Sequence, residues 1–331
     1  MGGVSRQTES ATFPPDRYYC LLDELPVHLV QRNFRRNLHL DNGEFDELRL
    51  SPECRIYSAE QIPEEFVDQP DLLSGFALQG TIAWVRDHES RSLHPFWLSP
   101  RLEILLRSLP KGEPFAALMD ADTLRLLKAA GILISDGAQE KAHERHQLRI
   151  QRSAELFRTK GYAPIESLIH PFHVAALRRY YRYMIRSGNI YLGDHQSSRR
   201  YVAHNDPVAR FFHRQIVASL GEIAGEPLKP SYVYMASYLS GAELKKHTDR
   251  EQCEFSITMC LDFSPEPEMA SSWPIQLDAA SGPVKVYQMI GDGLAYRGTK
   301  LPHYRGKLPE GQSSTSIFFH YVAADYSGPL D

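Results

Sequence analysis

The spacing of apolar residues predicts helices in the middle of the chain and strands toward its C-terminal end. Residues 171–186 and 206–225 each have apolar positions at the helical period, and Asp206 is placed to cap the second helix. A helix before Gly161 is expected to lead through a glycine turn into a strand. From Pro230 onward, short runs rich in β-branched and aromatic residues alternate with turn residues. This last region is therefore predicted to form an all-β barrel or sandwich.

The first part of the chain is patterned more weakly. Residues 48–58 and 75–87 look like short strands. Two helices are predicted next, one after Ser99 and one capped by Asp120 or Asp122, followed by the strand Ile-Leu-Ile-Ser.

The order helix, turn, helix, strand within residues 95–136 is compatible with a small winged-helix-like module. The second helix offers only Arg125 and Lys128 as basic residues, which does not make a recognition helix. A packing or substrate-presenting role is expected here rather than DNA binding.

A polar, charged segment at 135–147 has no apolar periodicity and is interpreted as a linker or an exposed helix start. It divides the chain into an accessory domain of residues 1–145, with mixed α and β structure, and a second domain of residues 147–331. The predicted fold class is α+β.

Composition excludes several classes of partner. The 331 residues include 41 acids and 37 bases, a formal net charge of −4, so neither nucleic acid nor a membrane surface is an expected partner. No stretch approaches the roughly 20 consecutive apolar residues of a membrane-spanning helix. The four cysteines form no Cys-x-x-Cys pair. Free thiols and a cytoplasmic location are the expectation.

Three residues in the β-rich region have the chemistry of metal ligands. His247 and Asp249 form a His-x-Asp pair, and both side chains are expected on one face of an extended strand. His303 follows near the end of the region, on another predicted strand. Two imidazoles and one carboxylate on one face of a metal leave three positions open, which is the facial triad of non-haem Fe(II) oxygenases.

With the sequence around them, these residues resemble the core of the 2-oxoglutarate/Fe(II)-dependent dioxygenases. Tyr238-Leu-Ser-Gly precedes the pair, and Gly291-Asp-Gly-Leu-Ala-Tyr-Arg-Gly precedes the distal histidine. The resemblance implies a double-stranded β-helix, or jelly roll, at about residues 230–324, with flanking helices. It also implies Fe(II) bound by His247, Asp249 and His303, 2-oxoglutarate as cosubstrate, and O₂ as oxidant.

The chain departs from the family at the cosubstrate. Many members have Arg or Lys where this chain has Ser313. Because a guanidinium matches a carboxylate, Arg305 is expected to bind the far carboxylate of 2-oxoglutarate, with Arg297 as the other candidate and the hydroxyl of Ser313 in support. Tyr232 and Tyr238 lie where family members often place a donor to the cosubstrate, and packing in the barrel core is the alternative for both.

The resemblance implies oxidation of an unactivated C–H bond with decarboxylation of 2-oxoglutarate to succinate. Hydroxylation is the expected outcome, and desaturation, epoxidation and cyclisation stay open. The candidate substrates are an amino acid, a peptide side chain or a small natural product, and Arg199, Arg250 and Arg297 are candidates to contact it. The alternatives are a cupin-like metal protein and a non-enzymatic jelly-roll binding module. The sequence does not predict an oligomeric state.

Overall fold

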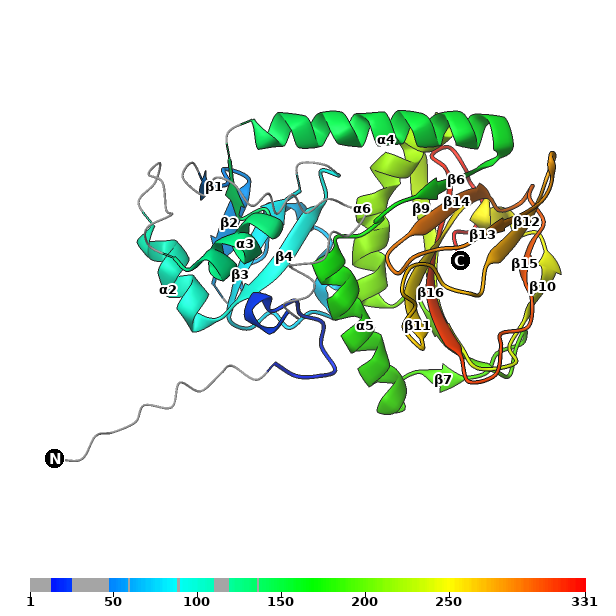
Figure 1. Ribbon diagram of the computed structural model, residues 1–331, viewed down its shortest axis with the longest axis horizontal. Helices are drawn as coiled ribbons and strands as arrows, with labels where there is room; N and C mark the ends of the chain where they lie inside the picture. Colours follow the sequence, from blue (N-terminus) through cyan, green and yellow to red (C-terminus); the bar gives the residue numbers. More distant parts are fainter. Residues whose placement is uncertain (1–12, 26–47, 59, 88–89, 110–118, 136) are drawn as a thin grey trace.

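The computed structural model describes residues 13–25, 48–58, 60–87, 90–109, 119–135 and 137–331 (Figure 1). Over these ranges the chain combines helices with antiparallel sheets, as the α+β prediction requires. None of the described helices is both long enough and apolar enough to cross a bilayer. All four cysteines have free thiols.

The described residues of the N-terminal part form two small sheets and two helices. One sheet has the order β2 (Cys54–Tyr57), β3 (Thr81–Arg86), β4 (Leu93–Leu98), and the other pairs β1 (Arg49–Leu50) with β5 (Leu133–Ile134). The helices are α2 (Pro100–Ser108) and α3 (Ala121–Ala129), and the short 3₁₀ turns are η1 (Leu22–Glu24), η2 (Glu64–Phe66) and η3 (Pro70–Leu73). The predicted helix–helix–strand order is present, and the winged-helix interpretation of it remains a prediction.

The cap of α3 is one of the two that the sequence allowed. Asp120 accepts a hydrogen bond from the backbone N–H of Thr123 at 2.8 Å. This bond satisfies one of the donors that the first turn of a helix leaves unpaired.

Three longer helices follow, namely α4 (Ala138–Lys160), α5 (Pro171–Arg186) and α6 (Pro207–Ala224). The polar segment at 135–147 is mostly the beginning of α4, which is the second of the two interpretations, an exposed helix start. The sequence has no apolar stripe over these residues, so the pattern alone did not decide between a helix and a linker. Gly161 ends α4 with φ of 76°, as expected. The division into domains of 1–145 and 147–331 falls within this helix and remains a prediction.

Two larger sheets form the C-terminal part. The seven-stranded sheet has the order β6 (Tyr162–Ile165), β14 (Gly293–Arg297), β11 (Phe255–Ser264), β16 (Ser313–Ala323), β9 (Leu228–Tyr238), β8 (Arg200–His204), β7 (Tyr191–Leu192). The four-stranded sheet has the order β10 (Leu244–His247), β15 (His303–Arg305), β12 (Ile275–Ala279), β13 (Gly282–Val286). Between β10 and β11 lies the 3₁₀ turn η4 (Glu251–Cys253).

The two faces of the seven-stranded sheet pack against different partners. Residues such as Ile257 and Phe319 belong to a large core with α5 and α6, which lie between this sheet and the N-terminal strands in Figure 1. On the opposite face, a second cluster joins the sheet to β12 through Leu294, Tyr296 and Leu277. Polar side chains of β11 and β16 lie on this inner face, because side chains alternate along a strand.

Candidate functional site

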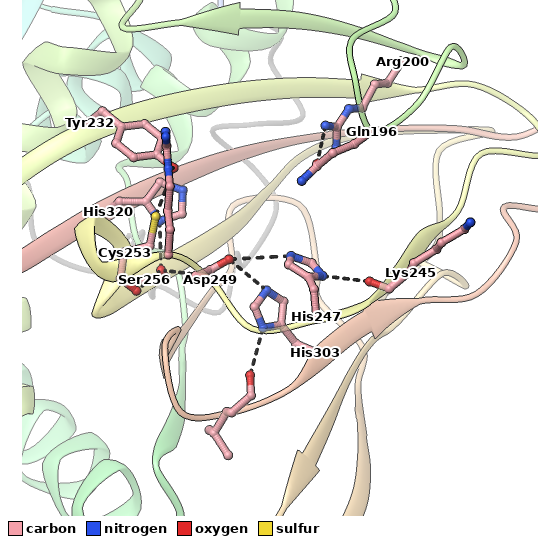
Figure 2. A network of polar contacts seen from close by, with 12 residues as sticks. Gln196, Arg200, Tyr232, Lys245, His247, Asp249, Cys253, Ser256, His303 and His320 are labelled. Carbon is pink, nitrogen blue, oxygen red and sulfur yellow. Dashed lines mark hydrogen bonds and ion pairs between the residues drawn. The ribbon is translucent and has the colours of Figure 1, made fainter. Parts of the chain in front are cut away.

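The three predicted metal ligands meet between the two sheets. His247 ends β10 and is paired in register with His303 of β15. Their Nε2 atoms lie 3.6 Å and 3.4 Å from Oδ1 of Asp249 (Figure 2). Asp249 follows the end of the strand and does not continue it, so a turn brings its carboxylate to the two rings. The donor atoms converge on one face, as a facial triad requires.

The backbone orients both imidazoles for metal binding. Nδ1 of His247 lies 2.7 Å from the carbonyl oxygen of Lys245, and Nδ1 of His303 lies 3.0 Å from that of Leu301. A carbonyl oxygen only accepts, so each Nδ1 carries the proton and donates it. In the neutral form of either ring the lone pair then lies on Nε2, the atom that faces Asp249.

The carboxylate of Asp249 is held from its other side. Its Oδ2 accepts a hydrogen bond from Oγ of Ser256 at 3.1 Å, and its backbone N–H donates to the carbonyl of Gly298 at 2.9 Å. Nδ1 of His320 contacts the same Ser256 Oγ at 2.9 Å. A Cβ at Gly298 would lie 2.4 Å from Oδ2 and 2.2 Å from the carbonyl of Cys253, so only glycine fits this approach.

The charge states at the site suit a bound cation. Burial, and after it the neighbouring His303, lowers the pKa of His247. Burial raises the pKa of Asp249, but the surrounding histidines His303, His320 and His247 together lower it, and that pKa lies below its usual value. Near neutral pH a neutral imidazole and an ionised carboxylate are thus present, and these are the forms that bind metals.

A cavity of about 480 Å³ adjoins the triad. Its walls are aromatic and basic, and they include Tyr232, Tyr234, Phe318, His204 and Arg250. The Arg250 guanidinium lies 4.9 Å from the ring centroid of Tyr232, whose hydroxyl lies 3.0 Å from Sγ of Cys253. The side of the triad that faces the cavity can therefore receive a ligand larger than water.

Arg305 occupies a buried place behind the triad. It is 3% exposed, donates to the carbonyl of Trp273 at 2.7 Å and to Gln288 at 3.2 Å, and contacts no carboxylate of the described residues. Burial lowers the pKa of this guanidinium. An arginine stays charged nevertheless, and a buried charge without a counter-ion is costly. A bound anion would therefore stabilise Arg305 at this position.

Three buried polar atoms near this arginine have no hydrogen-bond partner in the described part of the chain, namely Nε of Arg305, Oγ1 of Thr258 and Oγ of Ser316. Gln288 links two of these residues, because its amide donates to the carbonyl of Thr258 at 2.8 Å while its oxygen accepts from Arg305. Ser316 is on the neighbouring strand β16, paired with Cys260 of β11. Each of these atoms is a donor, and a carboxylate is an acceptor that would suit each of them.

The remaining predicted residues lie in different places. Tyr232, Tyr238 and Arg250 line the cavity. Arg297 and Ser313 do not line it. Arg297 lies over the rings of Phe157 and Phe255, on the opposite face of β14 from Tyr296. Ser313 is the first residue of β16 and is paired with Ser264.

Arg199, a substrate candidate from the sequence, lies outside the cavity, where it donates to the carbonyl of Ser240 at 3.0 Å. Its neighbour Arg200 lines the cavity instead, and donates to Tyr238 at 3.1 Å and to Asp194. Arg200 is the first residue of β8 and Arg199 directly precedes it, and successive side chains of an extended backbone point to opposite sides.

Sequence reasoning missed the residues that hold Asp249. Ser256 and His320 have no motif that marks them, and their contact depends on the pairing of β11 with β16. Thr258 and Ser316 were missed for the same reason. A signal was present only in retrospect: these four polar residues interrupt apolar strands at the inward-facing period.

No family model and no curated protein matches the chain. It is similar to solved structures of 2-oxoglutarate-dependent enzymes. One is the non-haem epimerase SnoN from nogalamycin biosynthesis, which is 14% identical with a TM-score of 0.46 over 54% of this chain and 82% of that one. A prolyl-4-hydroxylase from Pseudomonas putida is 16% identical with a TM-score of 0.43 over 53% and 98%.

A third structure is HygX from Streptomyces hygroscopicus, solved with nickel, 2-oxoglutarate and hygromycin B, which is 14% identical with a TM-score of 0.43 over 54% and 88%. SnoN has also been solved with Fe³⁺, α-ketoglutarate and nogalamycin RO. At such identities and TM-scores a likeness does not establish function, which has to come from the residues of the site.

Proposed function

We propose that this protein is a 2-oxoglutarate- and Fe(II)-dependent oxygenase whose two facing sheets form a double-stranded β-helix. The observation that carries the proposal is the convergence of His247, Asp249 and His303 beside a cavity. A ligand set of two imidazoles and one carboxylate with an open side is the one that non-haem Fe(II) oxygenases use.

The cosubstrate would be held by the buried polar group behind the triad. Arg305 would pair with the far carboxylate of 2-oxoglutarate, and the unpartnered hydroxyls of Thr258 and Ser316 would donate to it. The orphaned atoms support this assignment, because each becomes satisfied by the same anion. Tyr238 lines the cavity beside the triad, and its hydroxyl, which accepts from Arg200, is a further donor to a ligand there.

Fe(II) with 2-oxoglutarate, when bound, supplies the O₂-dependent oxidation of a C–H bond coupled to decarboxylation to succinate. The chain positions the ligands and keeps the reaction away from water. His247 and His303 direct their Nε2 atoms toward Asp249, and Ser256 holds the carboxylate of Asp249 in place. The aromatic walls of the cavity exclude water and orient the substrate.

We propose hydroxylation of an amino acid, a peptide side chain or another small molecule as the reaction. Arg250 is the candidate to bind a polar or anionic part of the substrate, since it lines the cavity directly after the ligand Asp249. Arg200 is already engaged by Asp194 and Tyr238, so a positioning role fits it better.

The test is anaerobic binding of Fe(II) and 2-oxoglutarate, followed by succinate release in air with a panel of amino acids, peptides and cell extract. Asp249→Ala or His247→Ala is expected to abolish succinate release, because the metal loses a ligand. Arg305→Gln is expected to weaken 2-oxoglutarate binding by about tenfold to a hundredfold, the value of a charge-assisted hydrogen bond.

Arg210→Gln is the matched control, because Arg210 pairs with Asp71 on the surface of α6 and lies outside the cavity. Succinate release that persists in Asp249→Ala would disprove the metal site. A wild-type chain that does not bind 2-oxoglutarate would favour the cupin-like or binding-module alternative.

A further inference from the structure

A second group of metal-binding side chains lies on the far side of Asp249 from the two histidines. Asp249, Cys253 and His320 each offer one donor atom, and these atoms lie within 4.8 Å of one another. Figure 2 shows Cys253 and His320 beside Ser256, with His247 and His303 on the other side of the carboxylate. All three members line the cavity, so a cation can reach them.

Two separate elements fix this group. Cys253 ends the 3₁₀ turn η4, where its N–H donates to the carbonyl of Arg250 at 2.9 Å. His320 of β16 is paired in register with Ser256 of β11, and Ser256 Oγ contacts both His320 and Asp249. Cys253 and His320 are 2% and 6% exposed, so an ion there would be surrounded mainly by protein.

The donors differ in kind from those of the facial triad. A thiolate, an imidazole and a carboxylate are the ligands that Zn²⁺ uses, and the sulfur also favours Cd²⁺ and Co²⁺. The facial triad contains no sulfur. The hydroxyl of Tyr232, 3.0 Å from Sγ of Cys253, is placed to donate to a thiolate.

We propose that Asp249, Cys253 and His320 form an alternative site for a thiophilic divalent cation, and that its occupation withdraws Asp249 from the facial triad. Coordination replaces the thiol proton of Cys253, which is released to solvent, and no oxidation or reduction is involved. Both sites draw on the single carboxylate of Asp249, so an ion at the alternative site competes with the facial triad for this ligand.

The alternative site binds its cation whether or not the protein is an oxygenase. The inhibition of activity that we expect from this binding rests on the proposed oxygenase function. If the facial triad holds Fe(II), then Zn²⁺ at the alternative site removes one of its three protein ligands. The enzyme would respond to thiophilic metals through a site that shares only Asp249 with the one that binds iron.

The test uses Co²⁺ added anaerobically to the full-length chain, with the thiolate-to-Co²⁺ charge-transfer band as readout. The wild type is expected to show the band, and both Cys253→Ser and Cys253→Ala are expected to lose it. Cys54→Ser is the matched control, because Cys54 lies in β2, away from the cavity, and the band should remain. His303→Ala removes a ligand of the facial triad only, and should keep or strengthen the band.

A wild type without the band, or a band that survives both substitutions of Cys253, would overturn the proposal. Circular dichroism of each variant checks that it has folded. In succinate assays, the Zn²⁺ concentration that halves activity should rise about tenfold in Cys253→Ser, relative to that variant's own activity. A Co²⁺ band without any succinate release would mean that the oxygenase proposal fails while this site stands. Succinate release without a Co²⁺ band would mean that the alternative site fails while the oxygenase proposal stands.

Discussion

At the scale of single residues, the site depends on how closely Asp249 is enclosed. Its carboxylate contacts His247 and His303 on one side and Ser256 on the other, and Gly298 passes close enough to exclude a side chain. The identity of the ligands follows from residue type alone. Their exact placement depends on residues that carry no metal-binding chemistry, and a change at such a residue should therefore affect the metal.

Gly298→Ala tests this enclosure. Its Cβ would lie 2.4 Å from Oδ2 of Asp249, so the carboxylate must move and Mn²⁺ affinity should fall by about tenfold or more, as for other groups that orient metal ligands. Isothermal titration with Mn²⁺ measures the change. Gly306→Ala is the control, because the nearest atom to its Cβ is 3.8 Å away, and its affinity should match the wild type. Equal affinities in both variants would show that Asp249 is not constrained by the glycine.

At the scale of elements, the helices α5 and α6 support the sheet from behind. Asp206 caps α6 by accepting from the N–H of Ala209 at 3.0 Å, and it also accepts from the hydroxyls of Tyr180 and Tyr181 on α5. One side chain thus caps the beginning of α6 and also joins this helix to α5. The sequence predicted the cap but not the two tyrosine contacts. Tyr180 and Tyr181 belong to α5, and the strands β7 and β8 separate them from Asp206 in the chain.

Asp206→Ala is expected to lower the free energy of unfolding by about 2–4 kcal/mol. Loss of the cap accounts for about 1 kcal/mol and the buried tyrosine hydroxyls left without an acceptor account for the rest. Urea denaturation followed by circular dichroism gives the value. Asp206→Asn retains an acceptor and should lose less, and Asp120→Ala, which removes the cap of α3 alone, should cost only about 1 kcal/mol. A loss no larger in Asp206→Ala than in Asp120→Ala would argue against the link to α5.

At the scale of the whole molecule, one hydrophobic core extends from the N-terminal part to the sheet of the site. Phe211 of α6 is fully buried against Phe66, Phe76 and Trp84, with ring centroids 5.3 Å, 5.0 Å and 6.3 Å apart. The side chain of Gln215 also bonds both backbone groups of Leu93 in β4. The N-terminal part therefore covers the apolar face of the helices that support the site.

The full chain is expected to unfold in a single calorimetric transition, since the shared core couples its two parts. Phe211→Ala should cost about 3–5 kcal/mol and lower the midpoint of that one transition, with loss of tertiary structure in both parts together. Tyr191→Ala is the control, because Tyr191 is 81% exposed and its removal should change stability by less than about 0.5 kcal/mol. Two separate transitions, with only one shifted by Phe211→Ala, would show that the parts fold independently.

The sequence by itself determined the chemical types at the site and most of the elements that carry them. His247, Asp249 and His303 were predicted as metal ligands from residue type and spacing, α5 and α6 from their apolar period, and β9, β11 and β16 from runs of β-branched and aromatic residues, because these signals are local in the chain. The tertiary structure alone decided which polar residues surround Asp249, which arginine faces the cavity, and that Arg305 is buried with no counter-ion among the described residues. These features depend on the register of strands distant in sequence: Ser256 meets His320 across 64 positions, and no local pattern specifies that pairing.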